Sequence, residues 1–104
     1  MKFMFVCTPI QTDVTLKQRL ELLKATKKWI AQRVKNGTIE VVYNFIEYGG
    51  LSIAELESVE AARDYLADFP ARQLFDWEVT PLLEHKKAID GSIRRLEKVV
   101  KKKK

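Results

Sequence analysis

Acidic side chains recur on the strand-like segments of this chain, and carboxylates are well suited to acid–base chemistry. Asp76 and Glu78 alternate onto one face of the last such segment, and Glu40 and Asn44 onto one face of the second. Tyr43 adds a hydroxyl donor. A carboxylate whose pKa is raised by an apolar pocket can remove a proton from carbon, while a donor stabilises the enolate. Glu78, Asp76 and Tyr43 are therefore catalytic candidates, and Glu40 and Asn44 are binding candidates.

These candidates also have plainer interpretations. Strand carboxylates commonly line a solvated rim or pair with Lys and Arg, because unpaired buried charge is rare. His85, the single imidazole, is the natural proton-transfer group at neutral pH and a further catalytic candidate, although its position favours a surface residue. Cys7 lies in an apolar run and is expected to be a buried, inert thiol. With one Cys and one His, a zinc site of the Cys/His type is excluded within one chain, and we expect no metal.

The first half of the chain contains a short strand and a long helix. Residues 2–8 form an apolar and aromatic run, which predicts a strand buried on both faces. Thr15 and Gln18 have the spacing of a capping box. Apolar residues then recur at helical spacing until Asn36-Gly37, where the glycine can adopt positive φ and end the helix. The face is formed by Leu16, Leu20, Leu22, Leu23, Trp29, Ile30 and Val34.

The middle of the chain predicts a hairpin. Residues 38–48 alternate with a period of two and are rich in β-branched and aromatic residues, which indicates a strand. Gly49-Gly50 is typical of a two-residue turn that needs positive φ, and residues 51–57 form the returning strand.

A second helix and a last strand follow. Ser58 is a suitable N-cap, and the apolar stripe after it stops at Pro70. Residues 74–79 alternate again, and Thr80-Pro81 is expected to end the strand. The order strand, helix, strand, strand, helix, strand predicts an α+β, ferredoxin-like βαββαβ domain with a four-stranded antiparallel sheet.

The C-terminal segment differs from the rest in charge. Residues 1–82 contain ten basic and eleven acidic residues, whereas residues 83–104 contain nine basic and three acidic ones. Residues 83–104 also show apolar residues at helical spacing, followed by the lysine run 101–104. We therefore divide the chain into a near-neutral domain, 1–82, and a basic C-terminal helical tail, 83–104.

The N-terminal apolar run is too short for a secretory signal. It spans five residues before Thr8-Pro9, whereas an h-region needs about 7–15. No stretch reaches the roughly 18 apolar residues of a membrane span. We expect a cytoplasmic protein without a membrane partner.

Several of these segments resemble the muconolactone isomerase family. The resemblance lies in Ser52-Ile53, in Glu57-Ser58-Val59-Glu60-Ala61, in Phe69-Pro70 and in Phe75-Asp76-Trp77-Glu78-Val79, with the helix end Gln32-Arg33…Gly37-Thr38. It covers roughly residues 1–85, and the motifs are those of the scaffold. The segment Val41-Val42-Tyr43-Asn44-Phe45 departs from the histidine- and arginine-rich second strand of the family, and the basic tail is extra.

The resemblance implies a dimeric α+β barrel in which two sheets face each other, with higher oligomers in the family. It implies a cofactor-independent isomerase that shifts a double bond in a small lactone or organic acid. The alternative is a non-catalytic dimerisation module whose tail helix binds a protein partner or a neighbouring subunit. Nucleic-acid binding by the tail is a weaker alternative, because the body is neutral and lacks the exposed aromatic pattern of a single-strand binder.

Overall fold

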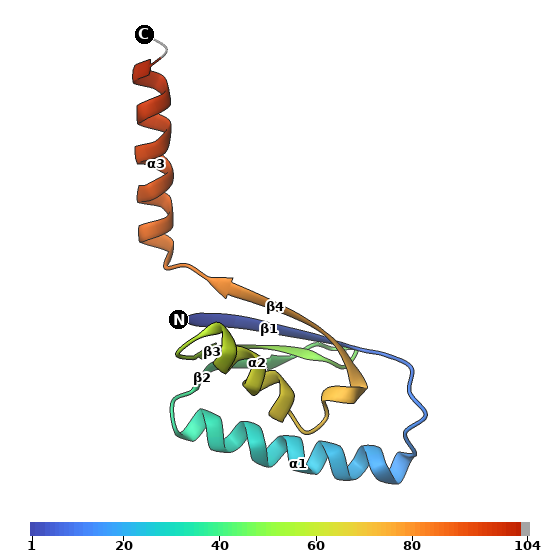
Figure 1. The fold of residues 1–104 in the computed structure, drawn as a ribbon. Helices are drawn as coiled ribbons and strands as arrows, with labels where there is room; N and C mark the ends of the chain where they lie inside the picture. The colour runs from blue at the N-terminus through green and yellow to red at the C-terminus, as the bar shows by residue number, and fades with distance from the viewer. Residues whose placement is uncertain (103–104) are drawn as a thin grey trace.

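The computed structural model describes residues 1–102 and consists of an α+β body and a projecting helix (Figure 1). The elements are β1 (Lys2–Pro9), α1 (Leu16–Lys35), β2 (Ile39–Asn44), β3 (Gly50–Glu55), α2 (Val59–Asp68), the short 3₁₀ helix η1 (Arg72–Leu74), β4 (Phe75–Leu82) and α3 (His85–Lys102). The four strands form one antiparallel sheet in the order β2-β3-β1-β4. The predicted ferredoxin-like βαββαβ fold is confirmed, together with the additional C-terminal helix.

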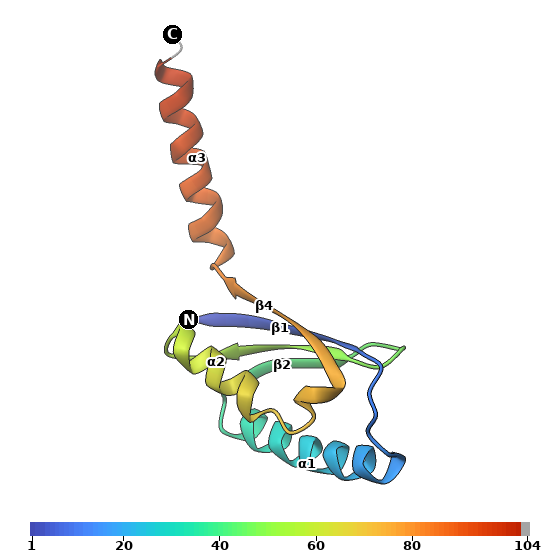
Figure 2. The ribbon, with the colours of Figure 1, turned by 45° about the vertical axis from the view of Figure 1, so that its right-hand side comes forward.

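Helices α1 and α2 cover one face of the sheet, and α3 leaves from the other side (Figures 1 and 2). The helix-covered face contributes Phe3 and Phe5, which pack with Trp29 of α1 and Tyr65 of α2. Tyr65 lies between the rings of Phe5 and Trp29, with centroid distances of 4.3 and 4.9 Å. The core is thus built around an aromatic cluster between the sheet and the two helices, together with Ile39, Ala54 and Ala62.

The opposite sheet face has no helix over it, and we call it the open face. In β1 the buried residues Phe3, Phe5 and Cys7 alternate with half-buried Met4 and Val6. The strand is therefore buried on one face only, which corrects the expectation of burial on both. Met4 pairs with Ile53 and Thr80, and Val6 pairs with Leu51 and Glu78, so these residues share the open face. Val41, which pairs with Ile53, extends this face into β2.

Both caps of the long helix are confirmed. The Thr15 hydroxyl accepts from the Gln18 amide, and the Gln18 side chain accepts from the Thr15 amide. Gly37 follows the C-cap with φ of +85°. The apolar stripe is only partly buried: Trp29 is in the core, whereas Leu16 and Leu20 are exposed. Leu22 is half-buried, so burial of the stripe decreases toward the N-terminus of α1.

The second strand and its turn differ from the prediction. A register shift between Ile39 and Val41 places an extra residue, Glu40, in the strand. The bulge interrupts the period of two, so Ile39 and Val41 point to opposite faces. The strand ends at Asn44 rather than residue 48, and Gly50 belongs to β3. Tyr48 and Gly49 adopt positive φ, so the turn precedes the predicted Gly49-Gly50 pair by about one residue.

The last strand is longer than predicted. Thr80 and Pro81 lie within β4, which pairs with β1 as far as Leu82. β4 is an edge strand, where a proline without an N–H is tolerated because only one side of the strand needs a full ladder. Helix α2 begins after its Ser58 cap and ends before Pro70, as predicted.

Helix α3 gives the molecule its elongated shape. The principal extents are 68 × 30 × 25 Å, and the radius of gyration is 18.4 Å, against about 13 Å for a compact domain of this length. None of the described side chains of α3 is buried. The end of the predicted lysine run, residues 103–104, lies outside the described residues. No helix within residues 1–102 combines the length and hydropathy needed to cross a membrane.

Candidate functional site

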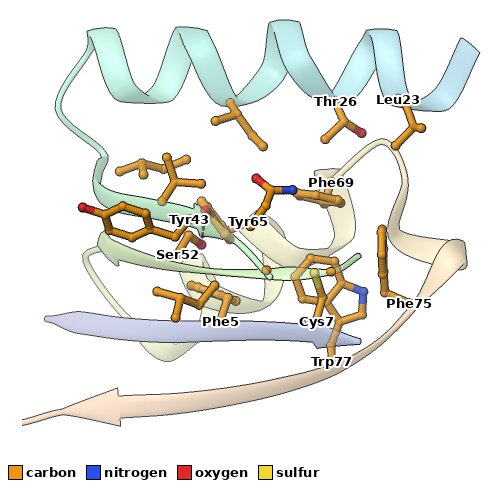
Figure 3. A pocket seen from close by; sticks show the side chains of 17 residues that line it. Phe5, Cys7, Leu23, Thr26, Tyr43, Ser52, Tyr65, Phe69, Phe75 and Trp77 are labelled. Atoms are coloured by element: carbon orange, nitrogen blue, oxygen red, sulfur yellow. Dashed lines mark hydrogen bonds between the residues drawn. The ribbon is translucent and has the colours of Figure 1, made fainter. Parts of the chain in front are cut away.

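A small apolar pocket lies between α1 and the helix-covered face of the sheet (Figure 3). Its volume is about 100 Å³, and it is partly open to solvent. The apolar wall is formed by Phe5, Ile30, Ile39, Val42, Phe69 and Phe75. On the sheet side, the small residues Gly50 and Ser52 of β3 line the pocket.

One pair of hydroxyl groups supplies the main polar feature of the pocket. The Ser52 Oγ and the Tyr65 hydroxyl oxygen are 3.0 Å apart and share a hydrogen bond (Figure 3). Two hydroxyls carry two protons, and their mutual bond uses one, so the other remains available to a ligand. Burial raises the pKa of Tyr65, although the Ser52 hydrogen bond and the Arg33 charge lower it in part. The phenol is therefore protonated at neutral pH and is able to donate a hydrogen bond.

Three further polar groups at the pocket, on Thr26, Trp77 and Cys7, are hydrogen-bonded or buried. The Thr26 hydroxyl donates to the Leu22 carbonyl at 2.8 Å, and the Trp77 Nε1 donates to the Arg72 carbonyl at 3.1 Å. The predicted burial of Cys7 is confirmed, and desolvation raises the pKa of its thiol. Among residues 1–102, no Asp, Glu, Lys, Arg or His lines this pocket.

The structure places the predicted binding residues of β2 on opposite faces. Glu40 forms an ion pair with Lys2 at 2.6 Å, and Lys2 alternates with buried Phe3 onto the open face. Asn44 pairs with Gly50 and lines the pocket on the helix-covered face. The expectation that Glu40 and Asn44 share a face is wrong, because the bulge at Glu40 shifts the alternation.

The carboxylates of β4 lie on the open face. Asp76 and Glu78 pair with Thr8 and Val6 of β1, on the side of the sheet away from the pocket. The same four side chains line a shallow groove there. Tyr43 is 70% exposed on the opposite edge strand, β2. Three strand spacings separate the two edges, which is about 14 Å, so Tyr43 and Glu78 of one chain do not meet on a small molecule.

His85 is exposed at the first residue of α3, as its surface interpretation predicts. Within the described part of the chain, no group of three or more His, Cys, Asp or Glu side chains is placed to hold a metal ion.

Sequence reasoning missed Ser52 and Tyr65. Tyr65 is three residues after Ala62 on the buried face of α2, and a buried tyrosine hydroxyl usually has a hydrogen-bond partner. That signal indicates a polar contact in the core. It does not identify Ser52, because their proximity depends on how α2 packs across β3.

Of the comparisons with known proteins, the one with solved structures supports the fold. No known family model and no curated protein matches the chain. Thirteen chains of solved structures match it. One is the crystal structure of a muconolactone isomerase at 3.3 Å resolution, with a TM-score of 0.69 and 31% sequence identity. The match covers 82% of this chain and 91% of that one. With this identity over nearly the whole length of the other protein, the chain belongs to the muconolactone isomerase family.

Proposed function

We propose that this protein binds a small lactone or organic acid, without a cofactor, in the pocket between α1 and the sheet. The observation that carries the proposal is the partly enclosed apolar pocket with a hydroxyl donor available at the Ser52–Tyr65 pair. An apolar wall takes up a hydrocarbon ring, and the donor orients one carbonyl oxygen. The related muconolactone isomerase acts on a lactone, a ligand of this kind.

The pocket favours a neutral carbonyl over a carboxylate. No cationic side chain lines it, so a buried carboxylate there would be desolvated without a partner charge. A lactone ring enters without that cost. The carboxylate of an organic acid is instead accommodated at the exposed mouth, which Leu23, Tyr43 and Asn44 border.

Ligand size is limited by the volume of the pocket. The enclosed space of about 100 Å³ is smaller than the roughly 150 Å³ cavity that holds benzene in an engineered protein core. A five-membered lactone therefore fills the enclosed part, and any substituent extends toward the mouth.

The binding proposal is tested by removing both hydroxyls at once. The double variant Ser52→Ala with Tyr65→Phe avoids leaving one buried hydroxyl without a partner. We expect its affinity for muconolactone, measured by calorimetry, to fall about five- to tenfold, the equivalent of one net hydrogen bond.

Tyr48→Phe is the matched control, because this tyrosine is 80% exposed in the β2–β3 turn. It removes the same hydroxyl and should leave affinity unchanged. Failure of the unmodified protein to bind muconolactone, or equal losses in both variants, would contradict the proposal.

Isomerisation by proton transfer is a second candidate function, favoured by the groove where Asp76 and Glu78 lie beside Thr8. In this proposal Glu78 removes the proton, Asp76 and His85 are the alternative acid–base groups, and Tyr43 is a donor. Because Tyr43 and Glu78 lie on opposite edges of one sheet, they act together only if a second copy brings them into proximity.

Turnover of muconolactone is the test of the isomerase assignment. We expect Glu78→Gln to lower kcat by about 10²-fold or more, the range contributed by a general base. Glu57→Gln, at an exposed position before α2, is the control and should retain activity. Full activity in both Glu78→Gln and Tyr43→Phe would remove these residues from the mechanism.

We further propose that two copies pair through their open faces to form a dimeric α+β barrel. The centre of that face is apolar and half-buried in the single chain, at Met4, Val6, Val41, Leu51 and Ile53. Two such faces stacked about 10 Å apart would remove these side chains from water.

A further inference from the structure

The indole of Trp29 packs against two residues that line the ligand pocket. Its ring makes edge-to-face contacts with Tyr65 at a centroid distance of 4.9 Å and with Phe69 at 5.2 Å. Tyr65 and Phe69 both line the pocket, whereas Trp29 stands outside the lining residues. Aromatic pairs of this kind are attractive only at suitable ring orientations. The position of Trp29 therefore influences two walls of the pocket at once.

No side-chain hydrogen bond orients the Trp29 ring within the described part of the chain. The residue is 8% exposed, and its indole Nε1 has no hydrogen-bond partner among residues 1–102. A buried indole N–H usually has a partner, which fixes the ring against rotation. The orientation of this ring must therefore come from the groups packed against its faces and edges.

Arg33 packs on one face of that ring. Its guanidinium carbon lies 3.8 Å from the centroid of the Trp29 ring, within the range of a cation–π interaction. The Arg33 Nη1 donates to the Trp29 carbonyl at 3.2 Å, so the guanidinium is itself held above the ring. Arg33 is half-buried, which reduces the screening of this contact by water. The cation thus supplies a fixed contact to a ring that lacks a hydrogen bond.

The charge of Arg33 also acts on the Tyr65 hydroxyl. No ion pair joins Arg33 to a carboxylate within residues 1–102. Its positive charge lowers the pKa of the Tyr65 phenol, against the larger effect of burial, because a nearby cation stabilises negative charge on the oxygen. Arg33 does not line the pocket, so this effect reaches the site from behind its aromatic wall.

We propose that Arg33 is a positioning residue for this site: its cation holds the Trp29 ring and, through that ring, the Tyr65 hydroxyl that bonds to Ser52 and to a ligand. Because Arg33 stands outside the pocket lining, its effect on a ligand passes through Trp29 and Tyr65. The inference rests on the binding function proposed above for the two hydroxyls.

The test is a double-mutant cycle on the affinity for muconolactone, measured by calorimetry. Arg33→Met keeps an unbranched side chain and removes the cation. We expect it to weaken binding about fivefold, the upper range of a partly exposed cation–π contact. In the protein that already carries Ser52→Ala with Tyr65→Phe, the same substitution should change affinity less than about twofold, because the hydroxyls that Arg33 positions are absent.

Arg33→Lys separates the cation from the shape of the side chain. Lysine keeps the positive charge and can lie over an indole face, so affinity should return to within about twofold of the unmodified protein. Arg63→Met is the matched control, because Arg63 is exposed on α2 and its side chain pairs with Asp64. This control should bind muconolactone as the unmodified protein does.

The outcomes distinguish failure of this inference from failure of the binding function. Equal losses for Arg33→Met with and without the two hydroxyls would overturn the positioning role, since Arg33 would then affect the pocket as a whole. A loss in Arg33→Lys as large as in Arg33→Met would overturn the role of the cation. Unchanged affinity of Arg33→Met, while the double hydroxyl variant binds more weakly, would overturn this inference alone. Failure of the unmodified protein to bind muconolactone would overturn both.

Discussion

At the scale of single residues, the pocket is a site for hydrogen bonding and burial. The Tyr65 phenol and the Cys7 thiol are its titratable buried groups, and burial raises the pKa of both. Each is therefore neutral near pH 7, and neither is a strong base. This is the physical reason for assigning ligand binding to the pocket and proton transfer to carboxylates elsewhere.

Cys7 gives a prediction about pH. A thiol with a raised pKa in the folded state keeps its proton after the unfolded chain has lost it, so its contribution to stability is complete below about pH 8.5. It declines as pH rises toward the folded-state pKa, by at most about 1.4 kcal/mol per pH unit. We expect urea unfolding to show this loss between pH 8.5 and 9.5, before tyrosines titrate at about pH 10.

The variant Cys7→Ala should have a flatter profile over the same interval. Reaction of native Cys7 with a disulfide reagent should also be much slower than in urea, since the thiol is 8% exposed. Equal alkaline slopes in the two proteins would show that other groups cause the loss.

Individual site residues were harder to predict from the sequence than buried ones. The burial of Cys7 is predicted correctly, because apolar surroundings along the chain indicate a buried side chain. Ser52 and Tyr65 were not identified, since 13 positions separate them and only the packing of α2 over β3 brings the hydroxyls to 3.0 Å. Glu40 and Asn44 were assigned to one face because alternation alone does not reveal a bulge.

At the scale of elements, local signals predicted most of the fold. The Thr15 capping box and the Ser58 cap each satisfy amides that a helix start leaves unpaired, so their sequence patterns correspond directly to structure. The end of β4 was predicted too early because Pro81 is unfavourable in a central strand. Only the strand order shows that β4 lies at an edge.

Gly49 in the β2–β3 turn and Gly37 after α1 both adopt positive φ, so substitutions at the two positions can be compared directly. A Cβ at Gly49 would lie 2.2 Å from the Cys7 carbonyl oxygen, whereas a Cβ at Gly37 would meet nothing within 4 Å. Their φ values, +78° and +85°, are similar. Gly37→Ala should therefore cost only the left-handed penalty of about 1–2 kcal/mol.

Gly49→Ala should cost more than about 4 kcal/mol, because the backbone of β1 must move as well. Chemical denaturation of both variants measures the difference. Similar losses in the two proteins would mean that the turn relaxes without displacing β1.

At the scale of the whole molecule, the body has one covered and one open sheet face. If two copies pair through the open face, a charge at its centre should separate them. We expect Ile53→Asp to shift the protein to a monomer in sedimentation experiments, with a dissociation constant raised at least about 100-fold by the buried charge.

Val59→Asp is the comparison for this variant, because Val59 is 64% exposed on α2, away from the sheet. It should sediment as the unmodified protein does. An unchanged mass for Ile53→Asp, in a protein that retains its circular dichroism, would exclude the open face as the pairing surface.

Pro81 also affects which contacts the sheet makes with other chains. An exposed strand edge can template further strands and lead to aggregation, and proteins counter this with prolines, charges and bulges at their edges. Here Pro81 lies in the edge strand β4, while the other edge, β2, contains the bulge at Glu40 and its ion pair with Lys2. Both borders of the sheet therefore discourage fibril-like growth, which leaves the faces of the molecule as its routes to ordered assembly.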